Sequence, residues 1–117
     1  MIRVDVVLPC LDEAAALPDV LARLPEGYRA IVVDNGSSDG SAEVAAEAGA
    51  TVIHEARRGY GSAVHAGLAA AEAPIVAFAD ADASFDLGQL PDVVGPVARG
   101  ERDLMLGSRV MQGRGAW

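Results

Sequence analysis

Two aspartates separated by one alanine, Asp80 and Asp82, follow a short apolar run, and their carboxylates could bind a metal ion. In an extended segment, side chains two residues apart point the same way. Two carboxylates that close raise each other's pKa unless a cation lies between them. Mg²⁺ or Mn²⁺ takes oxygen ligands and bridges to a diphosphate. We therefore interpret Asp80-Ala81-Asp82 as a candidate metal and diphosphate site, with a solvated acidic loop as the alternative.

A second polar segment, residues 34–40, follows another apolar run and opens a predicted helix. Gly36 permits a left-handed backbone, and the serines and the aspartate at 37–39 can cap a helix. An ordinary capped turn has this composition. The functional alternative is that Asp34 or Asn35 hydrogen-bonds a nucleobase or a ribose.

Glycines and an arginine follow two further apolar runs. Gly59 and Gly61 resemble the start of a dinucleotide fingerprint, but position 64 is Val where a third glycine is needed. Dinucleotide binding is therefore disfavoured, whereas a small-residue loop that lets the backbone approach a ligand still fits. Arg109 can grip a phosphate bidentately, although a purely structural arginine fits the same position.

The elements that position these residues alternate along the chain. Short β-branched runs predict strands at 4–8, 30–33, 51–53, 75–79 and 104–106. Longer segments with three- and four-residue apolar spacing predict helices near 13–24, 38–48, 62–73 and 87–98. This order predicts an α/β fold with three layers, α/β/α, around a mostly parallel sheet. In such sheets, ligands bind beyond the carboxyl ends of the strands near a switch in strand order.

Composition excludes several function classes. The 117 residues suffice for one domain, and all nine basic residues are arginine, so no P-loop or Schiff-base lysine exists. The net charge of −8 disfavours nucleic-acid binding, which needs a basic surface. One cysteine, Cys10, excludes an internal disulfide or a cysteine-cluster zinc site. Without a signal peptide or an apolar run of membrane-spanning length, we expect a cytoplasmic location.

Taken together and in order, five segments resemble the family 2 glycosyltransferases, which have the GT-A fold. Among these, the sequence is most similar to the polyprenyl-phosphate (dolichyl-phosphate) mannosyl- and glucosyltransferase branch. The segments that carry the resemblance are 6–13, 32–41, 59–63, 80–82 and 107–109.

The resemblance implies transfer of a hexose, with inversion, from a nucleotide-diphosphate sugar of the UDP-glucose or GDP-mannose type. The implied acceptor is a polyprenyl phosphate, which would bring the enzyme to the inner membrane face. The implied cofactor is Mg²⁺ or Mn²⁺ on Asp80 and Asp82, and the implied phosphate ligand is Arg109. The residues expected to bind the nucleotide sugar are Pro9, Leu11, Glu13, Asp34, Asn35, Gly61, Asp80, Ala81 and Asp82. No catalytic base is assigned.

The sequence departs from the family pattern at four positions, which hold Asp12, Asn35, Tyr60 and Ser84. Asn35 replaces the second aspartate of many members, and Tyr60 replaces the lysine typical of the dolichyl-phosphate mannose enzymes, which leaves glucose open. Because family members are longer, residues 1–117 are expected to be the N-terminal nucleotide-sugar-binding part, without the acceptor-binding part.

Three alternatives remain at this point. One is a retaining enzyme of the glucosyl-phosphoglycerate synthase type. A second is a nucleotide-binding module that turns nothing over. A nucleotidyltransferase is disfavoured, because the segment after the first strand, 9–13, lacks a Gly-rich basic loop. The oligomeric state is not predicted.

Overall fold

The computed structural model describes residues 3–83, 86–92, 94 and 105–106. Five strands form one sheet in the order β3-β2-β1-β4-β5, and every pairing is parallel. The strands are β1 (Val4–Cys10), β2 (Tyr28–Asp34), β3 (Thr51–His54), β4 (Ile75–Phe78) and β5 (Met105–Leu106). The helices are α1 (Leu17–Ala22), α2 (Ser41–Glu47), α3 (Tyr60–Ala70) and the 3₁₀ helix η1 (Leu87–Gln89). The predicted α/β class and all five predicted strands are confirmed.

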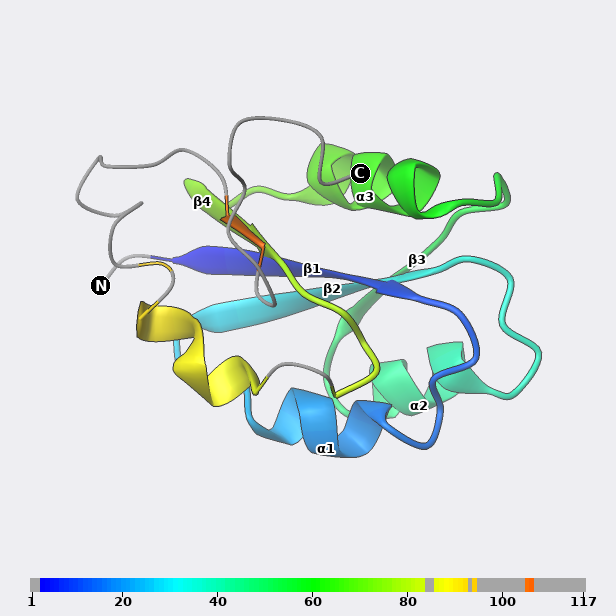
Figure 1. Cartoon of the computed structure of the whole chain (residues 1–117), viewed down its shortest axis with the longest axis horizontal. Coiled ribbons are helices and arrows are strands. Elements are labelled where there is room, and N and C mark those ends of the chain that lie inside the picture. Colours follow the sequence, from blue (N-terminus) through cyan, green and yellow to red (C-terminus); the bar gives the residue numbers. More distant parts are fainter. Residues whose placement is uncertain (1–2, 84–85, 93, 95–104, 107–117) are drawn as a thin grey trace.

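The helices cover both faces of the sheet, with α1 and α2 on one side and α3 on the other (Figure 1). The chain moves outward from β1 through β2 to β3, then returns to place β4 on the opposite side of β1. Because crossovers between parallel strands are right-handed, this reversal moves the connecting helix to the other face. The three layers predicted from the sequence follow from that reversal.

The two cores reflect the alternation of side chains along β1. Val4, Val6 and Leu8 pack with α1, α2 and η1, whereas Val7 packs with Phe78 and residues of α3. These β1 side chains are at most 2% exposed. A strand buried on both faces needs a continuous apolar run, which is what this sequence provides.

Pro9 does not end β1, contrary to the sequence-based expectation of a strand over 4–8. The carbonyl of Val7 accepts a hydrogen bond from the N–H of Ala79, so Val7 and Pro9 both face β4. Pairing with β4 stops at Val7, opposite Phe78. The missing N–H of proline therefore costs no ladder hydrogen bond, and β1 continues to Cys10 beside β2.

Three predicted helices form, each with shifted ends. The largest shift is in α1, which starts at Leu17 rather than near residue 13 because residues 14–16 form a turn. The predicted helix at 87–98 is represented by η1 and by helical residues at 90–92 and 94. The rest of that prediction lies outside the described residues.

A buried carboxylate, Asp5, ties the amino ends of the strands to the connection between α3 and β4. Asp5 is 1% exposed and accepts two hydrogen bonds from Arg29, at 3.0 and 3.1 Å. The backbone N–H groups of Glu72 and Ala73 donate to it at 2.7 and 3.0 Å. Burial raises the pKa of Asp5, but these hydrogen bonds and the Arg29 charge outweigh burial and lower the pKa to about 2.

Helix α3 lies close to the sheet at Gly67. A Cβ built on Gly67 would come 2.3 Å from Cγ1 of Val7 and 3.1 Å from Cγ2 of Val33. Both valines belong to central strands whose positions are set by pairing, so they have little room to move. Gly67 therefore determines how near α3 approaches β1 and β2.

We expect Gly67→Ala to lower the free energy of unfolding by about 1–3 kcal/mol, because an added methyl group overpacks the core. Urea denaturation measures this change. Gly61→Ala in the same helix is the matched control, since a Cβ there meets no atom within 4 Å. The control should be neutral or stabilising by up to about 1 kcal/mol. Equal effects of the two substitutions would contradict the close packing at Gly67.

The carboxylate of Asp5 should make stability depend on acid pH. A group whose folded pKa is depressed contributes stability above its unfolded pKa and loses it as pH falls through the folded pKa. A shift from 3.8 to about 2 corresponds to about 2 kcal/mol, lost between about pH 4 and pH 2. Asp5→Asn should be less stable at pH 7 and should lose this slope, as measured by urea denaturation at several pH values.

The control for Asp5 is Asp19→Asn, because Asp19 pairs with Arg23 on the surface with its side chain 66% exposed. That substitution should leave both stability and the acid slope close to wild type. An Asp5→Asn protein that keeps the wild-type slope below pH 4 would assign the slope to other carboxylates.

Candidate functional site

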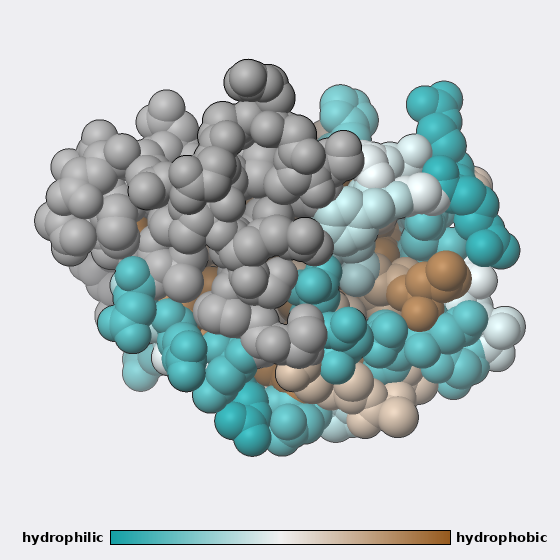
Figure 2. Space-filling model, viewed as in Figure 1, coloured by the Kyte–Doolittle hydropathy of each residue, from teal (hydrophilic) through white to brown (hydrophobic). Residues whose placement is uncertain are grey.

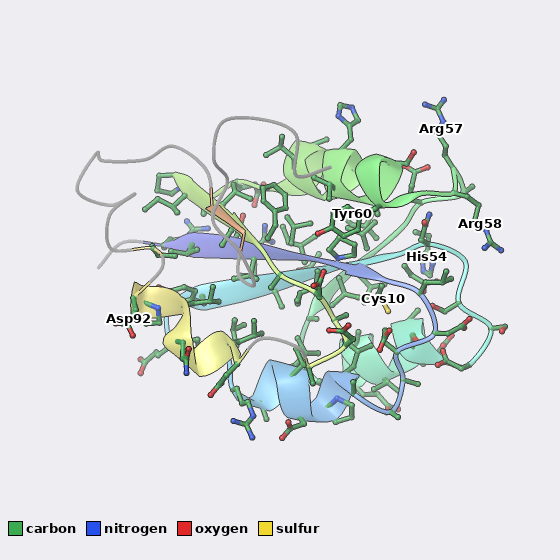
Figure 3. The ribbon with its side chains drawn as sticks, viewed as in Figure 1. Cys10, His54, Arg57, Arg58, Tyr60 and Asp92 are labelled. Carbon is green, nitrogen blue, oxygen red and sulfur yellow. The ribbon has the colours of Figure 1, made fainter. Side chains whose placement is uncertain are left out.

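The candidate site lies at the carboxyl ends of β1, β2 and β4. Strand order reverses between β1 and β4, which leaves room where the connections following these two strands diverge. The ends of β1, β2 and β4 and the segments that follow them hold the carboxylates and the Asp34-Asn35 pair that the sequence predicted. Figure 3 shows Cys10, His54, Arg58 and Tyr60 at this end of the molecule and Asp92 at the other.

A cluster of carboxylates gathers around Glu13, which is half-buried. Burial raises the pKa of Glu13, and the negative charges of Asp82, Asp39, Asp12 and Asp80 raise it further. Because β1 and β4 are paired neighbours, the loops that follow them start side by side, and the charges of Asp80 and Asp82 act on Glu13. Within the described residues, no three His, Cys, Asp or Glu side chains form a ready-made metal site.

The segment that carries Asp80 and Asp82 is not extended, which corrects the sequence-based argument for it. Strand β4 ends at Phe78, residues 81–82 form a turn, and Ala83 adopts a left-handed φ of 68°. Ala81 is 2% exposed and belongs to the core, while Asp80 is half-buried and Asp82 is exposed. The turn buries Ala81 and leaves the flanking Asp80 and Asp82 more exposed. The alternation of side chains along a strand is therefore not the reason for their exposure.

The loop after β1 is joined to the loop after β2 by a set of hydrogen bonds. Asp12, at a left-handed φ of 56°, donates its backbone N–H to Oγ of Ser37 and accepts from the N–H of Ser38, both at 2.9 Å. The N–H of Glu13 donates to the buried Ser41 hydroxyl at 2.9 Å. The N–H of Ala14 donates to Asp39 at 3.0 Å. Side chains of the β2–α2 loop therefore position Glu13.

Asp34 ends β2 and is 6% exposed. Its Oδ1 accepts from the N–H of Ser37 at 3.3 Å, and its Oδ2 lies 3.6 Å from Nδ1 of His54 at the end of β3. The structure thus places the predicted base-contacting carboxylate at the site with only a small exposed area. His54 itself is largely exposed.

Asn35 is 7% exposed, and its side chain holds the connection between β3 and α3. Nδ2 donates to the carbonyls of Glu55 and Arg57, both at 2.9 Å. Oδ1 accepts from the N–H of Gly59 at 3.0 Å. Its backbone N–H also donates to the carbonyl of Cys10 at 2.9 Å, which links β1 to the same hub.

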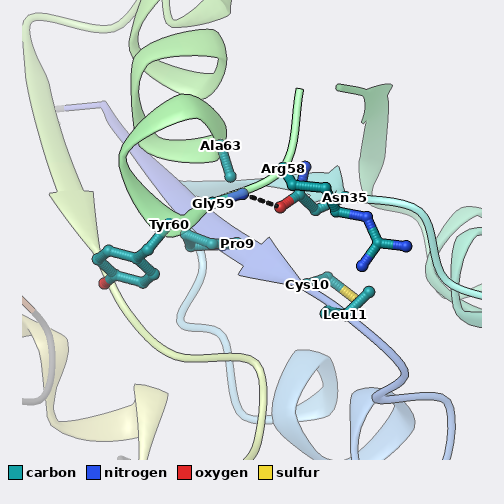
Figure 4. A pocket seen from close by; sticks show the side chains of 8 residues that line it. All are labelled: Pro9, Cys10, Leu11, Asn35, Arg58, Gly59, Tyr60 and Ala63. Carbon is teal, nitrogen blue, oxygen red and sulfur yellow. Dashed lines mark hydrogen bonds between the residues drawn. The ribbon is translucent and has the colours of Figure 1, made fainter. Parts of the chain in front are cut away.

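A pocket of about 360 Å³ opens beside this hub (Figure 4). Apolar side chains predominate, with one cation at the rim and the Tyr60 ring on the opposite side from the Arg58 guanidinium. Figure 2 shows a small brown, apolar area surrounded by teal on this side of the surface. The lining residues are Pro9, Cys10, Leu11, Asn35, Arg58, Gly59, Tyr60 and Ala63.

The predicted site residues divide into three groups. Pro9, Leu11 and Asn35 line the pocket, and Glu13 lies near the Asp80-Ala81-Asp82 turn. Gly61 does not line that pocket and instead borders a separate polar depression with Glu55, Arg57, Ser62 and His65. Arg109 and Ser84 lie outside the described residues.

The sequence pattern indicated a small-residue loop at Gly59 and Gly61, but not that Arg58, Tyr60 and Ala63 form a second wall of the pocket. Arg58, Gly59, Tyr60 and Ala63 come from the β3–α3 loop and the first turn of α3. Arg57 extends away from the molecule (Figure 3). Arg58 lies over Gly36 instead, where a Cβ would come within 3.7 Å of its guanidinium. The sequence did contain one indication of this wall. Gly59 follows Arg58 directly, and a glycine at that position indicates a turn in the chain.

The chain belongs to glycosyl transferase family 2, because the profile of that family matches residues 5–116. The predicted family is therefore confirmed. An uncharacterized glycosyltransferase of Mycobacterium tuberculosis is 58% identical over 106 residues, covering 91% of this chain and 48% of that protein. A dolichyl-phosphate hexose transferase of Haloferax volcanii is 33% identical over 111 residues, covering 92% of this chain and 48% of that protein.

Solved structures show the same architecture. Glucosyl-3-phosphoglycerate synthase of Mycobacterium tuberculosis, in complex with Mn²⁺, UDP-glucose and phosphoglyceric acid, superimposes with a TM-score of 0.74 at 32% identity. The match covers 85% of this chain and 40% of that one. The chain thus spans about half the length of the two sequence relatives and less of this structure. In the described part of the chain, no helix combines the length and apolar character needed to cross a bilayer.

Proposed function

We propose that residues 1–117 are the donor-binding part of a glycosyltransferase that takes a nucleotide-diphosphate hexose with a divalent cation. The hexose is transferred with inversion to a polyprenyl phosphate. The observation that carries this proposal is that the segments with Glu13 and with Asp80 and Asp82 follow the paired strands β1 and β4 at the strand-order switch, where a pocket with one cationic side chain opens nearby. Family membership supports the reaction type.

The residues present suit a divalent cation. Glu13 has a raised pKa partly because four aspartates surround it, so the site carries more negative charge than its own cations neutralise. Asp80 and Asp82 would hold Mg²⁺ or Mn²⁺ together with the donor diphosphate, which supplies the remaining oxygen ligands. When bound, the ion supplies charge neutralisation for the departing nucleotide diphosphate.

The chain's own groups bind and orient the donor. Pro9 and Leu11 offer an apolar surface to the nucleoside, and Asp34 presents a carboxylate oxygen at the end of β2. Glu13 is held by the Ser41 hydroxyl beside the diphosphate position. Arg109, from the segment after β5, is proposed to contact a donor or acceptor phosphate.

A polyprenyl phosphate acceptor fits the chemistry of this part of the chain. A phosphate oxygen is already an anionic nucleophile, so it needs little help from a general base. We therefore assign no catalytic base. The similarity to a dolichyl-phosphate hexose transferase supports this acceptor class. Because such an acceptor is held in a bilayer, we expect the reaction at the cytoplasmic membrane face.

A second candidate is retaining transfer of the glucosyl-3-phosphoglycerate synthase type. The superposition on that enzyme at 32% identity favours it. A third is donor binding without turnover by these residues alone. The three differ in product rather than in donor site, so the donor and the product are tested separately.

We expect Mn²⁺ to strengthen the binding of UDP or GDP by at least about tenfold, because an ion held by Asp80 and Asp82 would neutralise the charge of the diphosphate. Titration calorimetry of each nucleotide with and without Mn²⁺ measures this effect. Asp82→Ala should remove the metal enhancement and leave metal-free binding close to wild type.

The matched control is Asp92→Ala, which removes the same charge from an exposed position at the opposite end of the molecule (Figure 3). It should keep the full enhancement by Mn²⁺. Nucleotide affinity that is independent of metal in the wild type would contradict the proposed cation site.

Product analysis distinguishes the candidates for transfer. With UDP-glucose or GDP-mannose, Mn²⁺ and undecaprenyl phosphate, we expect a lipid-linked hexose with the inverted anomeric configuration, assigned by NMR. A retained anomer on 3-phosphoglycerate would favour the second candidate. Metal-dependent nucleotide binding with no product from either acceptor would favour the third.

A further inference from the structure

We propose that Asn35 is a positioning residue for donor recognition, which acts by placing Arg58 and Tyr60 on the pocket wall rather than by binding the nucleobase. This inference rests on the proposed function. The sequence had suggested a direct contact between Asn35 and the ligand, because an amide at a strand end can read a base. The hydrogen bonds of Asn35 give it a different role.

Both N–H groups of the Asn35 side-chain amide donate to groups of the protein itself. Nδ2 donates to the carbonyls of Glu55 and Arg57, each at 2.9 Å, and Oδ1 accepts from the N–H of Gly59 at 3.0 Å. Two carbonyls on one side and one N–H on the other determine which way the amide points. No N–H of Asn35 is left for a ligand, although the residue lines the pocket.

These three hydrogen bonds span the loop that forms the second wall of the pocket. They begin at Glu55, just after β3, and end at Gly59, just before α3. Arg58 lies between two of the bonded residues, and Tyr60 follows the last of them. Asn35 is only 7% exposed and makes three hydrogen bonds. Moving the loop would leave these buried polar groups without partners, so the loop has one preferred path.

The placement matters because Arg58 and Tyr60 lie on opposite sides of the pocket (Figure 4). Among the described residues that line it, Arg58 carries the positive charge that an anionic nucleotide can use. In a free loop the backbone positions of both residues would vary. The hydrogen bonds of Asn35 to the loop backbone fix these positions before binding, and preorganisation of this kind raises affinity.

The test is a double-mutant cycle between Asn35 and Arg58, with UDP and GDP affinities measured by calorimetry in Mn²⁺. Asn35→Ala should weaken nucleotide binding about tenfold while Arg58 is present, the cost of ordering the loop during binding. In the Arg58→Ala background it should weaken binding by less than about threefold, because the charged one of the two residues that it places is gone. The enhancement by Mn²⁺ should be the same in Asn35→Ala and wild type, since Asp80 and Asp82 belong to another loop.

A spectroscopic measurement reports on the loop itself. The N–H of Gly59 donates to Asn35, so its hydrogen exchange in ¹⁵N-labelled protein without ligand should accelerate in Asn35→Ala. Ser38→Ala is the control, because Ser38 contributes its backbone N–H to Asp12 and alanine keeps that group. The control should change neither Gly59 exchange nor affinity. If Asn35→Ala fails to fold, Asn35→Ser, which keeps one donor and one acceptor, replaces it.

Each outcome bears on the inference. Additive effects of the Asn35 and Arg58 substitutions, or a Gly59 exchange rate that does not change, would overturn it. A wild-type protein that binds neither nucleotide would overturn the proposed function and with it the link to donor recognition. In that case Gly59 exchange still decides whether Asn35 positions the loop.

Discussion

All the described strands run in one direction, and this single constraint determines where the site lies. Parallel strands place all their carboxyl ends on one edge, so every loop that follows a strand meets at that edge. The reversal between β1 and β4 then separates two neighbouring connections and opens space between them. Glu13 from one loop and Asp80 and Asp82 from another approach each other there because of strand order, not because of sequence proximity.

The carboxylates near Glu13 repel one another, which opposes folding, and the same negative charge attracts cations. Burial and the negative charges of four aspartates raise the pKa of Glu13, and a bound cation would relieve this repulsion. The loops that hold the carboxylates are tied together by hydrogen bonds, two of which are accepted by the carboxylates of Asp12 and Asp39. The hydroxyls of Ser37 and Ser41 accept backbone N–H groups of the β1–α1 loop without adding charge.

The opposite edge of the sheet provides the rigidity that such a site needs. Asp5, with its four hydrogen bonds, ties β1 to the start of β2 and to the segment before β4. Nearer the site edge, Gly67 lets α3 pack closely against Val7 and Val33 of the sheet. Functional groups are held accurately when they stand on elements whose own packing permits no adjustment. The packing away from the site therefore helps to hold the residues at the site edge in place.

The sequence by itself determined the α/β class, the five strands and the family, because buried parallel strands need uninterrupted apolar runs and because the motifs occur in a recognisable order. It also located Asp80, Asp82, Glu13 and Asp34 at strand ends. Tertiary structure alone decided that Pro9 stays within β1, since the neighbour on that side has already ended. Tertiary structure alone also decided that Asn35 and Arg58 line the same pocket. Hydrogen bonds between loops 20 or more residues apart have no periodicity that a linear pattern can reveal.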